Sequence, residues 1–160
     1  MLLSFFESIK YTGHLYPIAF MRIYIGYHYI SLAIERIEGQ FLVQPRLAAM
    51  IMNNLPDKEL PAWYAEGIQT LVVPNWQIFA YFLVYAQILL GASMLLGFLV
   101  RPMSLFGVLM CLNAIFLGNP SVMLLNQLFL VMFISILWVG AGRCLGFDYY
   151  FYKRQRGIWW

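Results

Sequence analysis

The stretch IFAYFLVYAQILLGASMLLGFLV (residues 78–100) contains no charged side chain. An α-helix needs about 20 apolar residues to cross the hydrocarbon core of a bilayer. The run is therefore predicted to be a membrane-spanning helix. Its GASMLLG segment supplies the small residues that let helices approach closely in a membrane.

Three further apolar runs share the chain with it, at residues 15–34, 102–118 and 122–142. Of the 160 residues, 62% are hydrophobic and 11% are charged, whereas soluble domains carry about 25% charged residues. Short connections before Pro102 and at the GNPS turn predict antiparallel neighbours. We therefore predict an all-α integral membrane protein, a four-transmembrane-helix bundle that forms one domain over residues 1–160.

The connection over residues 37–74 contains LAAMIMNNL and AWYAEGIQTLVV, which are too short to span and are predicted to be short interfacial helices.

The distribution of basic side chains predicts which side of the membrane this connection faces. The ends of the chain and the turn after residue 100 carry Lys10, Arg101, Arg143, Lys153, Arg154 and Arg156. The other side carries Arg36, Arg46 and Lys58 among several acids. The positive-inside bias predicts cytoplasmic N- and C-termini, an outer loop at 37–74 and a cytoplasmic tail at 143–160.

Several function classes are disfavoured by composition. The net charge of +3 is small and dispersed, which argues against nucleic-acid binding. Cys111 and Cys144 have no CxxC partner, so both are interpreted as structural and no metal site is predicted. His14 and His28 lie about 21 Å apart along one helix, too far for a shared haem. No carboxylate lies deep in a span, which disfavours proton-coupled transport. The start of the chain lacks a typical cleavage site, so the first helix is expected to be retained.

The first span, within PIAFMRIYIGYHYISLAIER (residues 17–36), contains Arg22 and His28. An ionised side chain at this depth costs about 2.5–3.5 kcal/mol. Helical geometry places Arg22, Gly26 and Tyr29 on one stripe and His28 on a nearly opposite one, which predicts a central helix. Three interpretations of Arg22 stay open: a guanidinium that reaches the headgroups, a buried structural pairing, or contact with a substrate or quinone headgroup. His28 is either a packing residue or a ligand.

The other polar residues within the spans are neutral. Gln87 lies near the middle of the second span, and Gly91 follows one turn later. Asn113 and Asn126 lie at similar depths in the third and fourth spans, where a hydrogen bond between them is geometrically sensible. Gly26, Gly91, Asn113 and Asn126 are therefore predicted to serve helix packing.

Three stretches in this order resemble the DoxX/DoxD family. They are RIYIGYHYI from Arg22, AQILLGASMLLGFLVRP from Ala86, and GAGRCLGFD from Gly140. That family includes the small membrane subunit of thiosulfate:quinone oxidoreductase. The resemblance implies a subunit in a bacterial or archaeal inner membrane that works with a redox partner and the quinone pool, or that supports sulfur and thiol redox chemistry at the membrane. One departure is Gln87, where the family often has a glutamate.

On this resemblance, Arg22 would donate hydrogen bonds to a quinone oxygen, with His28 and Gln87 as further polar contacts and Tyr81 and Tyr85 as an aromatic wall. The expected partners are the lipid bilayer, other membrane subunits and quinone, with no covalently bound cofactor. The alternative is a non-catalytic accessory subunit of a larger complex. Because relatives often have an acid where this chain has Gln87, the partner of Arg22 is predicted to be a neutral oxygen of the bundle, or a group outside this chain.

Overall fold

A computed structural model describes residues 16–55, 60–117, 120–140, 142 and 146–148. These residues form helices and turns, and no strand is found among them. In chain order the helices are α2 (Tyr16–Glu38), α3 (Arg46–Asn54), α4 (Ala62–Gly67), the π-helix η2 (Ile68–Val72), α5 (Trp76–Leu96), α6 (Val100–Leu117) and α7 (Pro120–Val139). The sequence-based prediction of an all-α protein is confirmed for this part of the chain.

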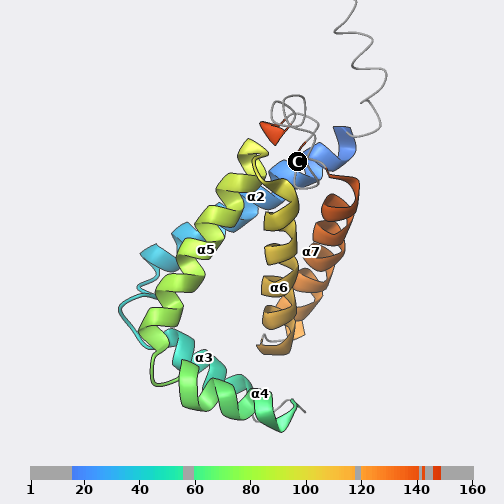
Figure 1. The fold of residues 1–160 in the computed structure, drawn as a ribbon. Coiled ribbons are helices and arrows are strands. Elements are labelled where there is room, and N and C mark those ends of the chain that lie inside the picture. The colour runs from blue at the N-terminus through green and yellow to red at the C-terminus, as the bar shows by residue number, and fades with distance from the viewer. Residues whose placement is uncertain (1–15, 56–59, 118–119, 141, 143–145, 149–160) are drawn as a thin grey trace, which may run out of the picture.

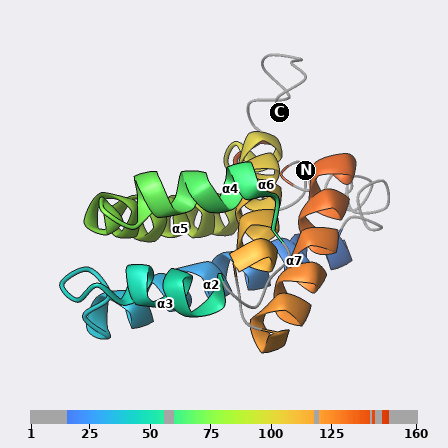
Figure 2. The same cartoon turned by 90° about the horizontal axis from the view of Figure 1, so that it is seen from below.

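The long helices associate as two pairs, α2 with α5 and α6 with α7. The pairs approach each other at one end of the molecule and diverge towards the other (Figure 1). The short helices α3 and α4 lie at the divergent end (Figures 1 and 2). The closed end is thus where the two pairs lie closest together (Figure 1).

Three of the helices in the described part of the chain are long and apolar enough to cross a membrane. They are α5, α6 and the Val122–Val139 part of α7. Three of the four predicted spans are therefore confirmed as helices that are long and apolar enough to cross a membrane. Helix α2 has sufficient length, but it carries Arg22, Glu35, Arg36 and Glu38.

Three predicted helix ends differ from the structure by several residues. The first run was expected to end at residue 34, but α2 continues to Glu38. A glycine explains each of the other two differences. The second apolar run was expected to remain helical to residue 100, but α5 ends at Leu96 because Gly97 adopts a left-handed φ of 67°. The Gly97 amide then bonds to the Ser93 carbonyl at 2.9 Å, which closes the helix end. The fourth run was expected to reach residue 142, but α7 ends at Val139, before Gly140 with a φ of 68°.

The outward faces of α5, α6 and α7 are apolar. Trp138 is 88% exposed, Leu128 65% and Phe82 63%. Hydroxyl groups on these helices bond to their own backbone: Ser104 donates to the Val100 carbonyl and Ser135 to the Val131 carbonyl. Apolar outer faces with internally satisfied polar groups are what a lipid environment requires, so the structure is that of a lipid-embedded helical protein.

Two apolar clusters hold the helices together. The larger cluster joins both pairs through side chains that include Ile25, Leu90, Met94, Phe133 and Ile136. The smaller one joins the short helices to the start of α5, through Leu47, Ile51, Ile68 and Ala80. The stretches LAAMIMNNL and AWYAEGIQTLVV thus correspond to α3 and to α4 with η2. The predicted tail at 143–160 lies outside the described residues, except for residues 146–148.

Candidate functional site: a buried polar junction at the closed end

Arg22 is fully buried, with 0% of its surface exposed. It projects from α2 towards the closed end of the two helix pairs, where two glycines leave room for it. A Cβ atom on Gly97 would lie 2.5 Å from its Nη1 atom, and a Cβ atom on Gly146 would lie 2.7 Å from the same nitrogen. Any larger residue at either position would collide with the guanidinium. The site therefore depends on glycine from two separate stretches of the chain.

Asp148 is the second buried charged residue of this junction, at 1% exposure. Its two carboxylate oxygens accept hydrogen bonds from the backbone amides of Leu99 (2.8 Å) and Val100 (3.0 Å). These amides lie at the start of α6, where the first N–H groups of a helix have no partner within the helix. Asp148 thus caps α6 from a distant part of the sequence, and its charge is favourable at this helix end.

The residues that carry Asp148, 146–148, are called the clasp below. The clasp also bonds through its backbone: the Phe147 amide donates to the Leu96 carbonyl at 3.3 Å, and the Asp148 amide donates to the Gly97 carbonyl at 3.0 Å. Beneath the Asp148 carboxylate lies Gly142, where an added Cβ atom would overlap the carboxylate itself. The clasp therefore connects the end of α7 to the turn between α5 and α6.

Burial and electrostatic attraction act in opposite directions on the pKa of Asp148, and burial has the larger effect. Burial raises the pKa of Asp148 above its usual value of 3.8, while the hydrogen bonds from Val100 and Leu99 and the positive charges of Arg22 and Arg101 act in the opposite direction. Arg22 therefore has a buried acid of its own chain as an electrostatic neighbour. The sequence-based expectation of a neutral oxygen or a group outside this chain did not include Asp148.

A folded-state pKa above the usual value fixes the sign of a pH effect. The contribution of Asp148 to stability is complete below pH 3.8 and is lost as the pH rises through the folded-state pKa. We expect the thermal unfolding midpoint of the wild type, relative to that of Asp148→Asn, to fall as the pH is raised from about 4 to 7. A difference that grows with pH would show that the pKa is lowered.

Gln87 does not face Arg22. It is buried at 3% exposure, and its Oε1 atom accepts a hydrogen bond from Nη1 of Arg36 at 3.1 Å. The Arg36 guanidinium also lies over the Phe41 ring, 5.2 Å from its centre. Ten residues of helix, or about 15 Å, separate Gln87 from Gly97 beside Arg22. Gln87 was expected as a further polar contact at the site of Arg22, and the structure places it beside Arg36 instead.

His28, Tyr81 and Tyr85 are not gathered around Arg22 either. His28 is half-buried and its ring lies 4.6 Å from the ring of Phe129 on α7. Tyr81 and Tyr85 stack on each other with ring centres 6.3 Å apart, on an exposed face of α5. The residues expected around Arg22 therefore lie in three separate places: Gln87 beside Arg36, His28 against Phe129, and the two tyrosines on the exposed face of α5.

Among the predicted packing residues, the glycines and the asparagines differ. A Cβ atom on Gly26 would lie 2.9 Å from the Gly91 carbonyl oxygen, and one on Gly91 would lie 2.8 Å from the Gly26 carbonyl oxygen. These glycines lie where α2 and α5 touch backbone to backbone. Asn126 instead donates to the Val122 carbonyl of its own helix at 2.7 Å, and Asn113 is exposed on α6. The expected bond between Asn113 and Asn126 is replaced by this local bond.

The junction unites three stretches that are far apart in the sequence. Arg22 comes from RIYIGYHYI, the α5–α6 turn from AQILLGASMLLGFLVRP, and Gly142 with the clasp from GAGRCLGFD. Within the described part of the chain, no three His, Cys, Asp or Glu side chains are grouped to hold a metal ion. Comparison with known proteins finds no matching family model, no matching curated protein and no matching solved structure.

Proposed function

We propose that the protein is a DoxX/DoxD-like membrane subunit of a redox assembly that contacts quinone or a partner oxidoreductase. The observation that supports this proposal is the spatial convergence of the three stretches on which the resemblance rests. Arg22, the α5–α6 turn and Asp148 belong to one buried junction. Stretches that form one structural unit are a stronger basis for a resemblance than three unrelated similarities would be.

In this proposal α2 is the fourth membrane-crossing helix and the bundle lies in a bacterial or archaeal inner membrane. The closed end, with the clasp, faces the cytoplasm, because the basic residues of the sequence are richer on that side. The short helices α3 and α4 then lie at the outer surface, where the 75% exposed Trp63 suits the headgroup region. The partner supplies the redox cofactor, and this chain supplies binding and orientation.

The role proposed for Arg22 differs from direct contact with quinone. Its side chain is fully buried, and its guanidinium nitrogen lies against Gly97 and Gly146. A quinone oxygen would have to displace the clasp to reach it. Arg22 is therefore a positioning residue, which holds α2 against the α5–α6 turn.

A second candidate function is that of a non-catalytic accessory subunit. The buried location of both Arg22 and Asp148 favours it, because these charges are engaged in holding the fold together. The exposed apolar faces of α6 and α7 would then pack against helices of a larger complex. Trp138, 88% exposed on α7, is suited to such a contact.

The two candidates are separated by gentle purification from the native membrane. We expect a stoichiometric oxidoreductase to co-purify, together with extractable quinone, and thiosulfate- or thiol-dependent quinone reduction to be lost when this subunit is deleted. Reintroduction of the wild-type chain is the control. An assembly that keeps this activity without the subunit would favour the accessory function. A protein that runs alone and conducts solutes in vesicles would contradict both.

A further inference from the structure

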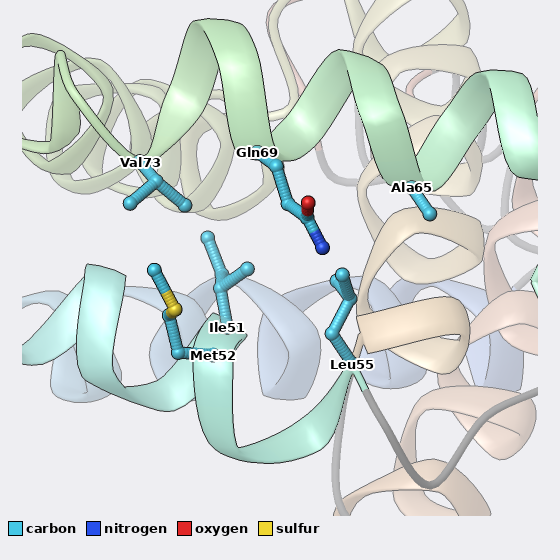
Figure 3. Close-up of a pocket in the computed structure, with 6 residues that line it drawn as sticks. All are labelled: Ile51, Met52, Leu55, Ala65, Gln69 and Val73. Atoms are coloured by element: carbon cyan, nitrogen blue, oxygen red, sulfur yellow. The ribbon is translucent and has the colours of Figure 1, made fainter.

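A cleft of about 450 Å³ lies between α3 and the segment formed by α4 and η2 (Figure 3). This volume is within the range of about 300–1,000 Å³ typical of small-molecule sites. Its lining consists of Ile51, Met52, Leu55, Ala65, Gln69 and Val73. Ile51 is 2% exposed and belongs to the buried cluster beneath the short helices, whereas Met52 is 57% exposed at the rim. The bottom of the cleft is therefore formed by a buried apolar side chain, and its rim is accessible from outside.

Among the described residues that line the cleft, Gln69 carries the one polar side chain, and this residue is exposed. Its amide extends from η2 into the space between the two helical segments, towards Leu55, which follows the end of α3 (Figure 3). Other side-chain amides nearby bond to protein groups, such as that of Asn54 to the Leu117 carbonyl at 2.9 Å. The amide of Gln69 makes no such bond to the residues that the structure describes. It thus presents both a donor and an acceptor to whatever occupies the cleft.

The lining also indicates the charge of a suitable ligand. None of the six described side chains that line the cleft is ionisable, and an unpaired carboxylate or phosphate among apolar groups is strongly disfavoured. The cations Arg36 and Arg46 line a separate hollow, together with Glu35. An anionic headgroup would be drawn to that hollow, so the cleft favours a neutral molecule with a carbonyl or hydroxyl oxygen.

We propose that the cleft binds one neutral, lipid-soluble molecule through a carbonyl or hydroxyl oxygen. That oxygen bonds to the amide of Gln69, while the apolar body of the molecule lies against Met52, Leu55 and Val73. The proposal rests on the cleft alone and holds whether or not the chain joins a redox assembly.

A photoreactive alkyl benzophenone tests this proposal, because it is a neutral ketone whose excited state labels nearby methionine. With the full chain in nanodiscs of neutral lipid, we expect label on Met52, which lines the cleft, and not on Met50. The comparison is internal, since both methionines are exposed on α3, at 57% and 40%. A benzophenone that carries a carboxylate is expected to label Met52 at least tenfold less. Equal labelling of the two methionines, or by the two probes, would overturn the proposal.

Two substitutions locate the bound oxygen and the body of the ligand. Gln69→Leu keeps the approximate size of the exposed side chain and is expected to weaken probe binding about fivefold, the effect of losing one neutral hydrogen bond. Gln127→Leu, at an exposed glutamine on α7, is the matched control and should leave binding unchanged. Ala65→Trp fills the cleft and should abolish labelling of Met52, with thermal unfolding as the check that it folds. Binding that is unchanged by Gln69→Leu would contradict the assignment.

Discussion

Replacement of Arg22 by methionine is expected to lower the free energy of unfolding by about 3–5 kcal/mol, as is typical when one member of a buried charged group is removed. Methionine retains the length of the side chain but not its charge or donors. The buried carboxylate of Asp148 would then lose an attractive positive charge. Thermal or SDS-induced unfolding of the purified protein, followed by circular dichroism, measures this loss.

Arg46→Met is the matched control for this experiment. Arg46 is exposed at the start of α3, where it donates to Gln44 at 3.0 Å, and exposed polar pairs contribute about 0–1 kcal/mol. Arg22→Lys should fall between the two, because it keeps the charge and loses the planar fork of donors. If Arg22→Met unfolds at the wild-type midpoint, the junction does not stabilise the closed end of the bundle.

The second large effect is expected from a single methyl group at Gly91. In Gly91→Ala the new Cβ atom would lie 2.6 Å from Cγ1 of Ile30 and 2.8 Å from the Gly26 carbonyl oxygen. The Ile30 side chain can rotate, but the carbonyl moves only if α2 and α5 separate. Overpacking of this kind costs about 1–3 kcal/mol, even though alanine has the better helix propensity.

Gly67→Ala provides a control of opposite sign. A Cβ atom there would meet nothing within 4 Å, and the backbone is right-handed helical with a φ of −58°. The substitution should therefore stabilise the protein by about 0.4–1 kcal/mol through the unfolded state. Comparison of the unfolding midpoints of the two variants in the same detergent separates the steric clash at Gly91 from the general effect of replacing glycine by alanine. Equal midpoints for the two variants would contradict a close backbone contact between α2 and α5.

The sequence predicted the apolar helices well because the hydropathy of a long run does not depend on its neighbours. The region of the short helices was also located correctly, since LAAMIMNNL and AWYAEGIQTLVV are apolar but too short to span. The helix ends were less accurate. At Gly97 and Gly140 the left-handed conformation is set by the turn that follows, and an apolar run gives no sign of it.

The candidate site was harder to predict because it depends on which helix faces meet. Arg22 was identified from its cost within an apolar run, but Gln87 was placed in the same expected site, whereas the structure pairs Gln87 with Arg36. Both glutamine and arginine have long side chains, so periodicity alone does not show which pair is in reach. Asp148 was missed because it follows the last apolar run. The signal that pointed to it is the glycine-rich GAGRCLGFD stretch, since glycines there make room for the carboxylate.

The clasp has a consequence for how the protein is made. Helix α6 begins at Val100, yet the carboxylate that caps it belongs to Asp148, which is translated after α7. While the ribosome is still synthesising α7, the first amides of α6 lack this acceptor, although the turn after α5 already joins the two helix pairs. A nascent chain that stops before the clasp therefore lacks the cap on α6 and the backbone hydrogen bonds from the clasp to that turn.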